Sequence, residues 1–163
     1  MTRTLIVLRH AKSSWGDPGL TDHARPLNKR GRASAKAIGD WLTYGGFAPD
    51  QVLCSDARRA QETWEHSGLT ADVQMMPHLY LSEAETLLSA VQQATGQCVM
   101  VIAHNPGIAD FADRIVTAAP THDRFADYPT AATLVAGWNG DWADLTFGNA
   151  IARAFTVPRD LIS

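Results

Sequence analysis

The sequence predicts an α/β fold: a three-layer sandwich with a mostly parallel central sheet, flanking helices and late antiparallel strands at the C-terminus. Short apolar runs of strand length alternate with longer segments that carry apolar residues at helical spacing. The last part of the chain instead shows two strand-like runs in succession, which favours an antiparallel addition to the sheet. With 163 residues, 45% hydrophobic and 19% charged, we expect a single domain over residues 1–163.

The first predicted strand covers residues 4–8, a continuous apolar and β-branched run of the kind buried on both faces. A helix is predicted over residues 29–43, where apolar side chains recur at helical spacing. Asn28 is its expected N-cap, and Gly45-Gly46 is expected to end it. This order, strand then helix, is the first half of a parallel crossover.

A second strand is predicted over residues 51–54, followed by Ser55-Asp56, which is expected to cap a helix over residues 57–67. Gly68 is the expected end of that helix. The apolar content of residues 73–76 indicates a third, weaker strand.

A capping box predicts the start of the next helix, with Ser82 as N-cap and Glu85 reaching back to it. This helix is expected to run to about Thr95 and to close at Gly96. Residues 99–102 then form the strongest central strand in the sequence.

Residues 105–107 predict a turn, after which apolar spacing predicts a further helix. Its apolar face is formed by Ile108, Phe111, Ala112 and Ile115. Two last strands are predicted over residues 131–138 and 151–157, joined through a turn at 139–141 and a longer loop.

Composition excludes several classes of function. A net charge of −3 argues against a general nucleic-acid binder. The longest apolar run, residues 98–103, is too short to span a bilayer, and the N-terminus lacks the pattern of a signal peptide. We therefore expect a cytoplasmic protein with no membrane or nucleic-acid partner. Cys54 and Cys98 lie in apolar runs and are expected to be buried, neither disulfide-bonded nor zinc-bound.

Cationic and imidazole side chains follow three of the predicted strands. Arg9-His10 comes after the first strand, Arg58-Arg59 follows the second, and His104 follows the central one, while Arg25 lies just ahead of the first helix. In open α/β sheets, ligands bind at the carboxyl ends of the strands. Burying unpaired cations is costly, and guanidinium groups bind phosphate oxygens in pairs. The sequence therefore predicts a phosphate site at this edge.

The two histidines indicate chemistry beyond binding. Neutral imidazole is a competent nucleophile near neutral pH, and phosphoryl transfer needs an in-line nucleophile with charge stabilisation around the phosphoryl oxygens. The sequence shows no Ser or Cys nucleophile with an adjacent base and no carboxylate cluster of metal-binding type. These residues predict a transfer through phosphohistidine that uses neither metal nor cofactor.

Four ordered segments resemble the signature blocks of the histidine phosphatase superfamily, the phosphoglycerate mutase-like branch. The first three are Leu8-Arg9-His10-Ala11, Ala24-Arg25-Pro26-Leu27 and Ser55-Asp56-Ala57-Arg58-Arg59-Ala60, and the fourth is Ile102-Ala103-His104-Asn105. The short chain, the Arg-Pro-Leu element and the tail over residues 147–161 resemble the SixA-type phosphohistidine phosphatases.

The resemblance implies a role for each matching residue. His10 would be the nucleophile that is transiently phosphorylated, and Arg9 and Arg59 would clamp the phosphoryl oxygens with His104. Arg25 matches the additional arginine of the SixA group, and Asn105 is expected to contact the substrate. Arg58 does not fall on the motif arginine and is expected to be solvated.

Other polar residues receive weaker expectations. Many superfamily members carry a carboxylate proton donor after the third strand, but Glu83 and Glu85 fit helix-capping roles here, which leaves the general acid open. His23, His66, His78 and His122 are expected at the surface. Lys12 fits either phosphate attraction or a free surface position, and Trp15 is an exposed loop residue that would line the rim of the site.

The resulting hypothesis is a phosphatase that acts on phosphohistidine of a partner protein, such as a histidine phosphotransfer domain. Two alternatives stay open: a small-molecule phosphomonoester phosphatase of the same superfamily, and a phosphate-binding interaction module without turnover. A mutase is disfavoured because the chain has no insertion to enclose a small substrate, so we expect an open, shallow site.

Overall fold

The computed structural model describes residues 2–162, and within them six strands form one mixed sheet in the order β3-β2-β4-β1-β5-β6. The pairs β1–β4, β4–β2 and β2–β3 are parallel, whereas β5 pairs antiparallel with β1 and β6 pairs antiparallel with β5. The strands are β1 (Thr2–Arg9), β2 (Gln51–Ser55), β3 (Asp72–Met76), β4 (Cys98–Ala103), β5 (Thr133–Asn139) and β6 (Ile151–Thr156).

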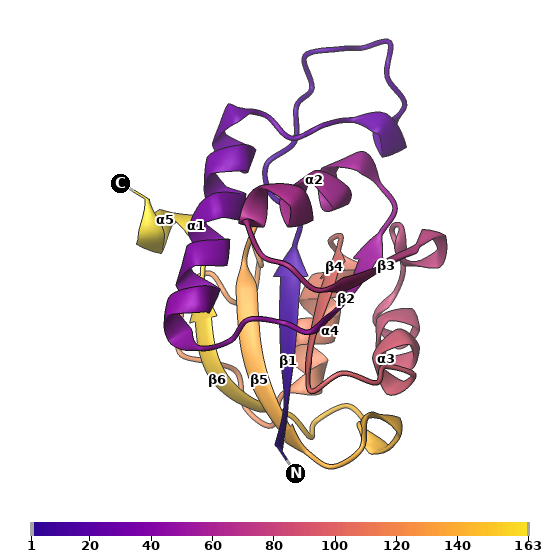
Figure 1. Cartoon of the computed structure of the whole chain (residues 1–163), viewed down its shortest axis with the longest axis vertical. Helices are drawn as coiled ribbons and strands as arrows, with labels where there is room; N and C mark the ends of the chain where they lie inside the picture. Colours follow the sequence, from indigo (N-terminus) through magenta and orange to yellow (C-terminus); the bar gives the residue numbers. More distant parts are fainter. Residues whose placement is uncertain (1, 163) are drawn as a thin grey trace.

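Helices cover both faces of the sheet, as Figure 1 shows. They are α1 (Lys29–Gly45), α2 (Arg58–Ser67), α3 (Ala84–Gln92), α4 (Gly107–Ile115) and the short α5 (Pro158–Leu161). Three 3₁₀ turns lie at Asp22–Ala24, Pro77–Leu79 and Trp142–Asp144. This architecture confirms the predicted α/β class, the mostly parallel sheet and the late antiparallel strands.

Alternating side chains of β1 build the two core layers. Leu5 and Val7 pack in the layer beneath α3 and α4, whereas Ile6 and Leu8 pack in the layer beneath α1 and α2. All four side chains are almost completely buried. A strand covered on both faces has no polar alternation, which is why its sequence reads as a continuous apolar run.

Helix α1 begins and ends as predicted. The side chain of Asn28 accepts the Gly31 N–H, and Gly46 ends the helix in the left-handed conformation with φ of 79°. Helix α2 begins one residue later than predicted, because Ser55 Oγ accepts the Ala57 N–H and leaves Ala57 at the N-cap position.

The predicted capping box of α3 is wrong. Leu81 has φ of 51°, and the Ser82 hydroxyl turns back to donate to the Leu79 carbonyl, so Glu83 occupies the N-cap position without a side-chain bond. The Ser82 carbonyl lies against Gly107, where an added Cβ would approach to 1.8 Å. This contact places the start of α3 beside the start of α4.

The end of α3 also differs from the prediction, at Gln92 rather than near residue 95. The side-chain oxygen of Gln51, on β2, accepts the N–H groups of both Thr95 and Gly96. These donors are thereby taken from the helix, which cannot extend through them.

Strand β5 begins at Thr133, two residues later than predicted. Ala131 has φ of 61°, and its N–H donates to the carbonyls of Arg9 and His10. Cys54 is buried as predicted, whereas Cys98 is only half-buried, and both are free thiols. No helix within residues 2–162 combines the length and apolar character needed to cross a membrane.

Candidate active site

The six predicted site residues meet in one pocket at the carboxyl edge of the parallel strands. Its volume is about 240 Å³, and we call it the catalytic pocket. Strand β1 delivers Arg9 and His10, the first turn of α2 delivers Arg59, and the segment after β4 delivers His104 and Asn105. Arg25 reaches the pocket from the loop that precedes α1. Together the six residues come from four separate segments of the chain, as the strand-end argument predicts.

The hydrogen bonding of His10 defines its tautomer. Nδ1 lies 2.7 Å from the Ala11 carbonyl oxygen, which accepts hydrogen bonds and cannot donate them. We therefore assign the ring hydrogen to Nδ1, so that Nε2 carries the lone pair. The ring is 6% exposed, and burial, together with the neighbouring His104 and Arg59, holds the pKa of His10 well below 6.5. His10 is thus an uncharged imidazole with a free lone pair at neutral pH.

His104 is held against His10 by a second hydrogen bond. The ring centroids are 5.1 Å apart, and His104 Nε2 lies 2.7 Å from Ser55 Oγ. Ser55 already accepts the Ala57 N–H, so its hydroxyl is available to donate to Nε2, and we assign the ring hydrogen of His104 to Nδ1. Burial first, and Arg59 next, lower the pKa of His104 to about 3. Both imidazoles are therefore neutral.

Several buried nitrogen atoms in the pocket lack a hydrogen-bond partner among residues 2–162. They are Arg9 Nε, Arg59 Nε and His104 Nδ1. An unsatisfied buried donor costs free energy, and such groups in a native structure call for an explanation such as a bound ligand. Arg9 is also destabilised as a cation, because burial and then the charge of Arg59 lower its pKa. A phosphate would satisfy these donors and offset this repulsion.

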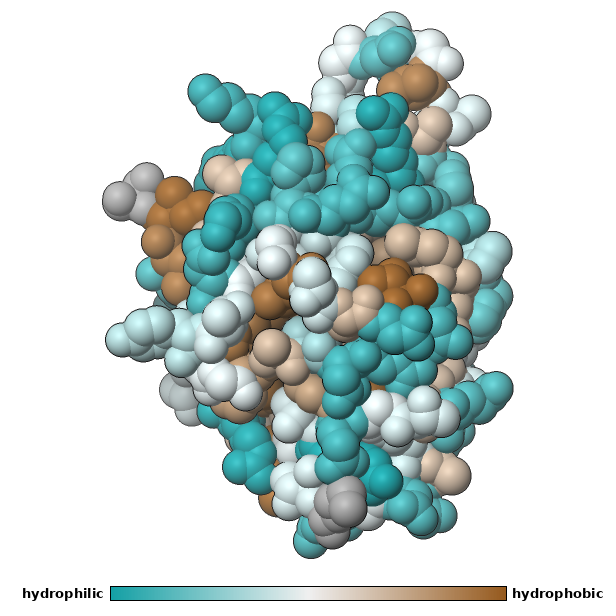
Figure 2. Space-filling view, in the orientation of Figure 1, coloured by the Kyte–Doolittle hydropathy of each residue, from teal (hydrophilic) through white to brown (hydrophobic). Residues whose placement is uncertain are grey.

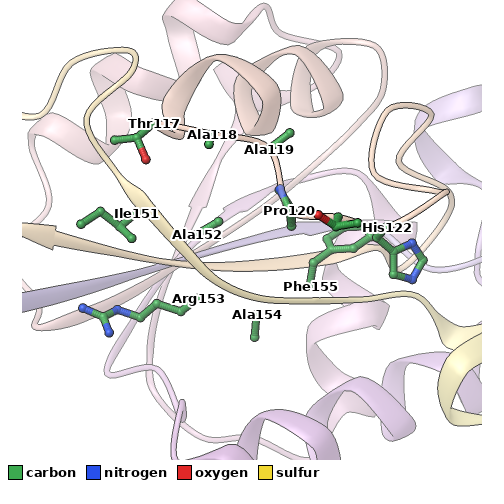
Figure 3. Close-up of a pocket in the computed structure, with 11 residues that line it drawn as sticks. Thr117, Ala118, Ala119, Pro120, His122, Ile151, Ala152, Arg153, Ala154 and Phe155 are labelled. Atoms are coloured by element: carbon green, nitrogen blue, oxygen red, sulfur yellow. The ribbon is translucent and has the colours of Figure 1, made fainter.

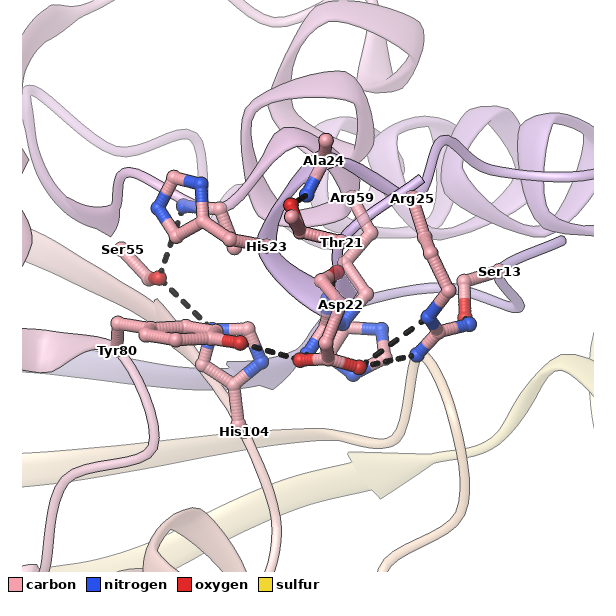
Figure 4. Close-up of polar contacts among 12 residues, drawn as sticks. Ser13, Thr21, Asp22, His23, Ala24, Arg25, Ser55, Arg59, Tyr80 and His104 are labelled. Atoms are coloured by element: carbon pink, nitrogen blue, oxygen red, sulfur yellow. Dashed lines mark hydrogen bonds and ion pairs between the residues drawn. The ribbon is translucent and has the colours of Figure 1, made fainter. Parts of the chain in front are cut away.

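An aspartate that the sequence analysis missed is bonded to two of the pocket arginines. Asp22 accepts hydrogen bonds from Arg59 at 3.0 Å and from Arg25 at 3.1 Å, and it also accepts one from the Tyr80 hydroxyl. Figure 4 shows its carboxylate between Tyr80 and Arg25, with the Ser55 hydroxyl directed at His104. The Tyr80 hydrogen bond first, and Arg59 next, lower the pKa of Asp22 to about 2. Asp22 is thus an anion that competes with phosphate for these arginines.

Tyr80 and His23 lie beside these groups, and the His23 side chain is 43% exposed, which agrees with its expected surface position. The His23 ring is half-buried, contacts Tyr80 edge-on at 4.8 Å, and pairs with Asp56 at 2.8 Å. The Tyr80 ring lies edge-on to His104 at 5.4 Å. Burial, and then the Asp22 hydrogen bond, raise the pKa of Tyr80. An Asp three residues before Arg25 was a local signal for the Asp22–Arg25 pair, whereas no short-range pattern marks Tyr80.

Adjacent arginines of α2 have opposite environments. Arg59 has a side chain only 4% exposed, whereas that of Arg58 is 54% exposed and pairs with Glu62 one turn later. This placement agrees with the expectation that Arg58 is solvated.

Asn105 and the two glutamates have definite partners. The Asn105 amide donates to the carbonyls of Asp127 and Tyr128, so it fixes the loop beside the pocket, and its substrate contact stays a prediction. Glu83 and Glu85 lie outside the catalytic pocket, along a neighbouring groove at the start of α3. Glu85 pairs with Arg114, so neither glutamate reaches the phosphate position from this arrangement.

The rim of the pocket carries exposed apolar side chains. Trp15 is 76% exposed, and its ring lies 3.6 Å from the Arg25 guanidinium carbon. Leu81, which also lines the pocket, is 55% exposed. Within residues 2–162, no group of three His, Cys, Asp or Glu side chains is placed to hold a metal ion. The pocket presents guanidinium and imidazole groups, which suit a phosphoryl group.

Comparison with known proteins defines the class. The Histidine phosphatase superfamily (branch 1) matches over residues 5–86. An uncharacterised protein of Mycobacterium tuberculosis (strain ATCC 25618 / H37Rv) is 33% identical over 159 residues, covering 93% of this chain and all of that protein. The chain therefore belongs to the histidine phosphatase superfamily.

Solved structures narrow the resemblance. A candidate phosphohistidine phosphatase SixA from Nakamurella multipartitia has a TM-score of 0.85 at 29% identity, over 97% of both chains. Another candidate SixA, from Agrobacterium tumefaciens, has a TM-score of 0.78 at 26% identity, over 96% of this chain and 99% of that one. These findings confirm the resemblance that the four sequence blocks indicated.

Proposed function

We propose that this protein is a phosphatase that removes the phosphoryl group from phosphohistidine on a partner protein, through a covalent intermediate on His10. The observation that carries this proposal is the hydrogen bond from His10 Nδ1 to the Ala11 carbonyl. It directs the lone pair to Nε2, in a pocket that also holds Arg9 and Arg59. A neutral, oriented imidazole beside cationic donors is the arrangement that nucleophilic phosphoryl transfer requires.

The reaction has two balanced steps. First, His10 Nε2 attacks phosphorus and forms a new N–P bond while the N–P bond of the substrate breaks, and the substrate ring, whose other nitrogen already carries a proton, leaves as neutral imidazole. Second, water attacks phosphorus, the His10 N–P bond breaks to restore the neutral imidazole, and inorganic phosphate leaves with the protons of the water. Arg9, Arg59 and His104 Nδ1 would donate to the phosphoryl oxygens in both steps.

The leaving group suits this pocket. Asp22 is ionised at neutral pH because its pKa is lowered to about 2, so in the unliganded protein it is a counter-ion and no proton donor. A protonated phosphohistidine departs as neutral imidazole, whose conjugate acid has a pKa of about 6.5. Such a group leaves without strong acid catalysis, whereas a serine alkoxide does not.

A protein substrate is supported by the rim of the pocket. Exposed Trp15 and Leu81 offer apolar contact area at its edge, and such side chains are common where proteins meet. The similar solved structures from Nakamurella multipartitia and Agrobacterium tumefaciens are both described as candidate phosphohistidine phosphatases.

Phosphate release from two phosphorylated peptides tests the proposal. The pure protein is expected to hydrolyse a phosphohistidine peptide and to leave a phosphoserine peptide of otherwise identical sequence nearly untouched. His10→Ala serves as the inactive control, and exhaustive chelation should leave the wild-type rate unchanged. Preference for phosphoserine would overturn the substrate assignment. Phosphate binding without release from either peptide would support the interaction-module alternative instead.

Small-molecule phosphomonoester hydrolysis is a second candidate, favoured by one observation: Tyr80 and Asp22 place protonatable groups beside Arg59. If either group donates a proton to an alkoxide, kcat/KM across a series of aryl phosphates will depend only weakly on the phenol's pKa. Under the phosphohistidine proposal the dependence is steep. It should also persist in Glu83→Gln, because Glu83 lies outside the catalytic pocket.

A further inference from the structure

A second cavity, of about 410 Å³, opens beside the catalytic pocket and shares Arg9, Lys12 and Thr130 with it. We call it the cationic groove and define it by its charged lining residues, Arg9, Lys12, Arg30, Arg124, Asp127 and Arg159. Its walls come from α1, from the segment before β5 and from α5, which lies beside α1 in Figure 1. The groove therefore continues the catalytic pocket along the surface.

The cationic groove is positively charged, whereas the chain as a whole is negatively charged. Five of its six charged residues are cationic, although the whole protein carries a net charge of −3. Its one carboxylate, Asp127, is paired with Arg124 at 2.9 Å. Within residues 2–162, no ion pair and no side-chain hydrogen bond involves Lys12, Arg30 or Arg159. Three cations thus face the groove without neutralisation.

Helix stability does not explain this concentration. Arg30 lies in the first turn of α1, which contains no acidic residue. The helix dipole disfavours cations at this end, because the first-turn N–H groups already carry partial positive charge. Arg159 faces the same groove from α5, on the other wall. Opposed cations that no side chain neutralises are favourable where an external anion lies between them.

We propose that the cationic groove is a second anion-binding subsite, which holds a carboxylate or phosphate group carried by the substrate beside the phosphoryl group in the catalytic pocket. This inference rests on the proposed function, because it assumes that a phosphoryl group occupies the catalytic pocket. Arg30 and Arg159 bind the second anionic group from opposite walls, and Lys12 lies between the two subsites by lining both. The substrate class is thereby narrowed to phosphorylated molecules with a neighbouring negative charge.

Calorimetric binding of two inorganic probes tests the subsite without catalysis. Inorganic tripolyphosphate, which carries neighbouring phosphate groups on one molecule, is expected to bind the wild-type protein more tightly than inorganic phosphate, because the two cavities share Arg9 and Lys12. In the double variant Arg30→Gln, Arg159→Gln this preference should fall by about 5- to 10-fold, as expected for two exposed ion pairs. The matched control Arg32→Gln removes an exposed arginine of the same helix turn that does not line the groove. It should keep the wild-type preference.

Three results would overturn the inference: no tripolyphosphate preference in the wild type, an undiminished preference in the double variant, or an equal loss in Arg32→Gln. Because both variants change exposed side chains, their thermal unfolding should match the wild type, which separates loss of binding from loss of fold. Failure of phosphohistidine hydrolysis would leave this binding test intact, so the two proposals fail separately.

Substrate pairs then identify the source of the second charge. One pair is a phosphohistidine peptide with flanking glutamates against the same peptide with glutamines, and the other is a small bisphosphate against its monophosphate. If the kcat/KM ratio of one pair falls in the double variant, the group that distinguishes the two substrates of that pair is the one that the cationic groove binds. The peptide pair would identify a carboxylate, and the bisphosphate pair a phosphate. Ratios that stay unchanged in both pairs would contradict a substrate-binding role.

Discussion

Two cavities of this molecule differ in whether the histidines and arginines of their walls find hydrogen-bond partners within the protein. The edge cavity, formed by residues 117–122 and the edge strand β6, encloses about 450 Å³, nearly twice the volume of the catalytic pocket. Figure 3 shows small side chains on one segment and the larger Ile151 and Arg153 on β6, with His122 beside Phe155. His122 pairs with Asp160 at 2.9 Å and contacts the Phe155 ring.

The catalytic pocket is smaller but chemically incomplete. Its buried Arg9 Nε, Arg59 Nε and His104 Nδ1 have no partner among the described residues, whereas the histidine of the edge cavity is paired within its own chain. The comparison teaches that volume is a poor guide to a phosphate site in this fold. A cluster of unsatisfied buried donors marks it better, because a folded chain retains them at a cost that a ligand recovers, whereas the single unsatisfied Arg3 Nε does not line this pocket.

The largest expected effect contrasts the histidines of the two cavities. His10→Ala should abolish turnover, since it removes the attacking nitrogen, whereas His122→Ala should retain it. Protein phosphorylated during turnover should be labile to acid, stable to alkali and absent in His10→Ala. Acid-stable label, or comparable losses of activity in both variants, would contradict the contrast between the two cavities.

The next largest effect is expected when the adjacent arginines Arg58 and Arg59 are replaced one at a time. Arg59→Gln should lower kcat by about 100- to 1000-fold, the usual loss for one charge-stabilising donor. Arg58→Gln should change kcat little, because its exposed guanidinium pairs with Glu62 and does not line the pocket. Steady-state kinetics on one aryl phosphate measures both. Similar losses at the two positions would mean that α2 presents a different residue to the phosphate.

Buried neutral imidazoles also predict the pH dependence of stability. The pKa of His104 is about 3 in the folded protein and about 6.5 when unfolded, so the unfolded state binds more protons as pH falls below 6.5. Stability should therefore decrease on acidification, by about 2 kcal/mol for this residue between pH 7 and pH 5. Urea unfolding at both pH values measures it. The decrease should shrink by that amount in His104→Gln, and an equal decrease in the variant would refute the assignment.

The smallest expected effect concerns the Asp22 carboxylate, which already binds two arginines of the catalytic pocket. Asp22→Asn removes a charge that competes for Arg59 and Arg25, so inorganic phosphate should inhibit about 3- to 5-fold more strongly. Asp17→Asn is the matched control, because Asp17 lies in the same loop and caps only the Gly19 N–H. Weaker inhibition in Asp22→Asn would show that this carboxylate orients the arginines more than it competes with phosphate.

Local patterns in the sequence predicted the strands, the helices and the residues at the strand ends. Continuous apolar runs identified β1 and β4, and the position after each strand placed His10 and His104 at the same edge. The sandwich follows from such short-range information, because burial on two faces leaves a clear imprint on sequence.

The site residues and helix ends that the sequence did not predict depend on contacts between distant segments of the chain. Asp22 meets Arg59 across 37 positions and Tyr80 across 58, so no local pattern announces either pair. The early end of α3 has the same origin, since Gln51 takes helix donors from another strand. The failed capping box at Ser82 reflects the left-handed turn at Leu81, a conformation that leucine rarely adopts.

Because the Trp15 ring lies against the Arg25 guanidinium, the fluorescence of this tryptophan should respond to a change at that arginine. Of the five tryptophans, Trp15 is the one that lines the catalytic pocket, and its indole contacts a guanidinium that is bonded to Asp22. When a phosphate displaces Asp22, the cation beneath the indole changes partner, and the fluorescence of that ring changes with it. Occupancy of the pocket can therefore be followed in real time by tryptophan emission, without a label and without turnover.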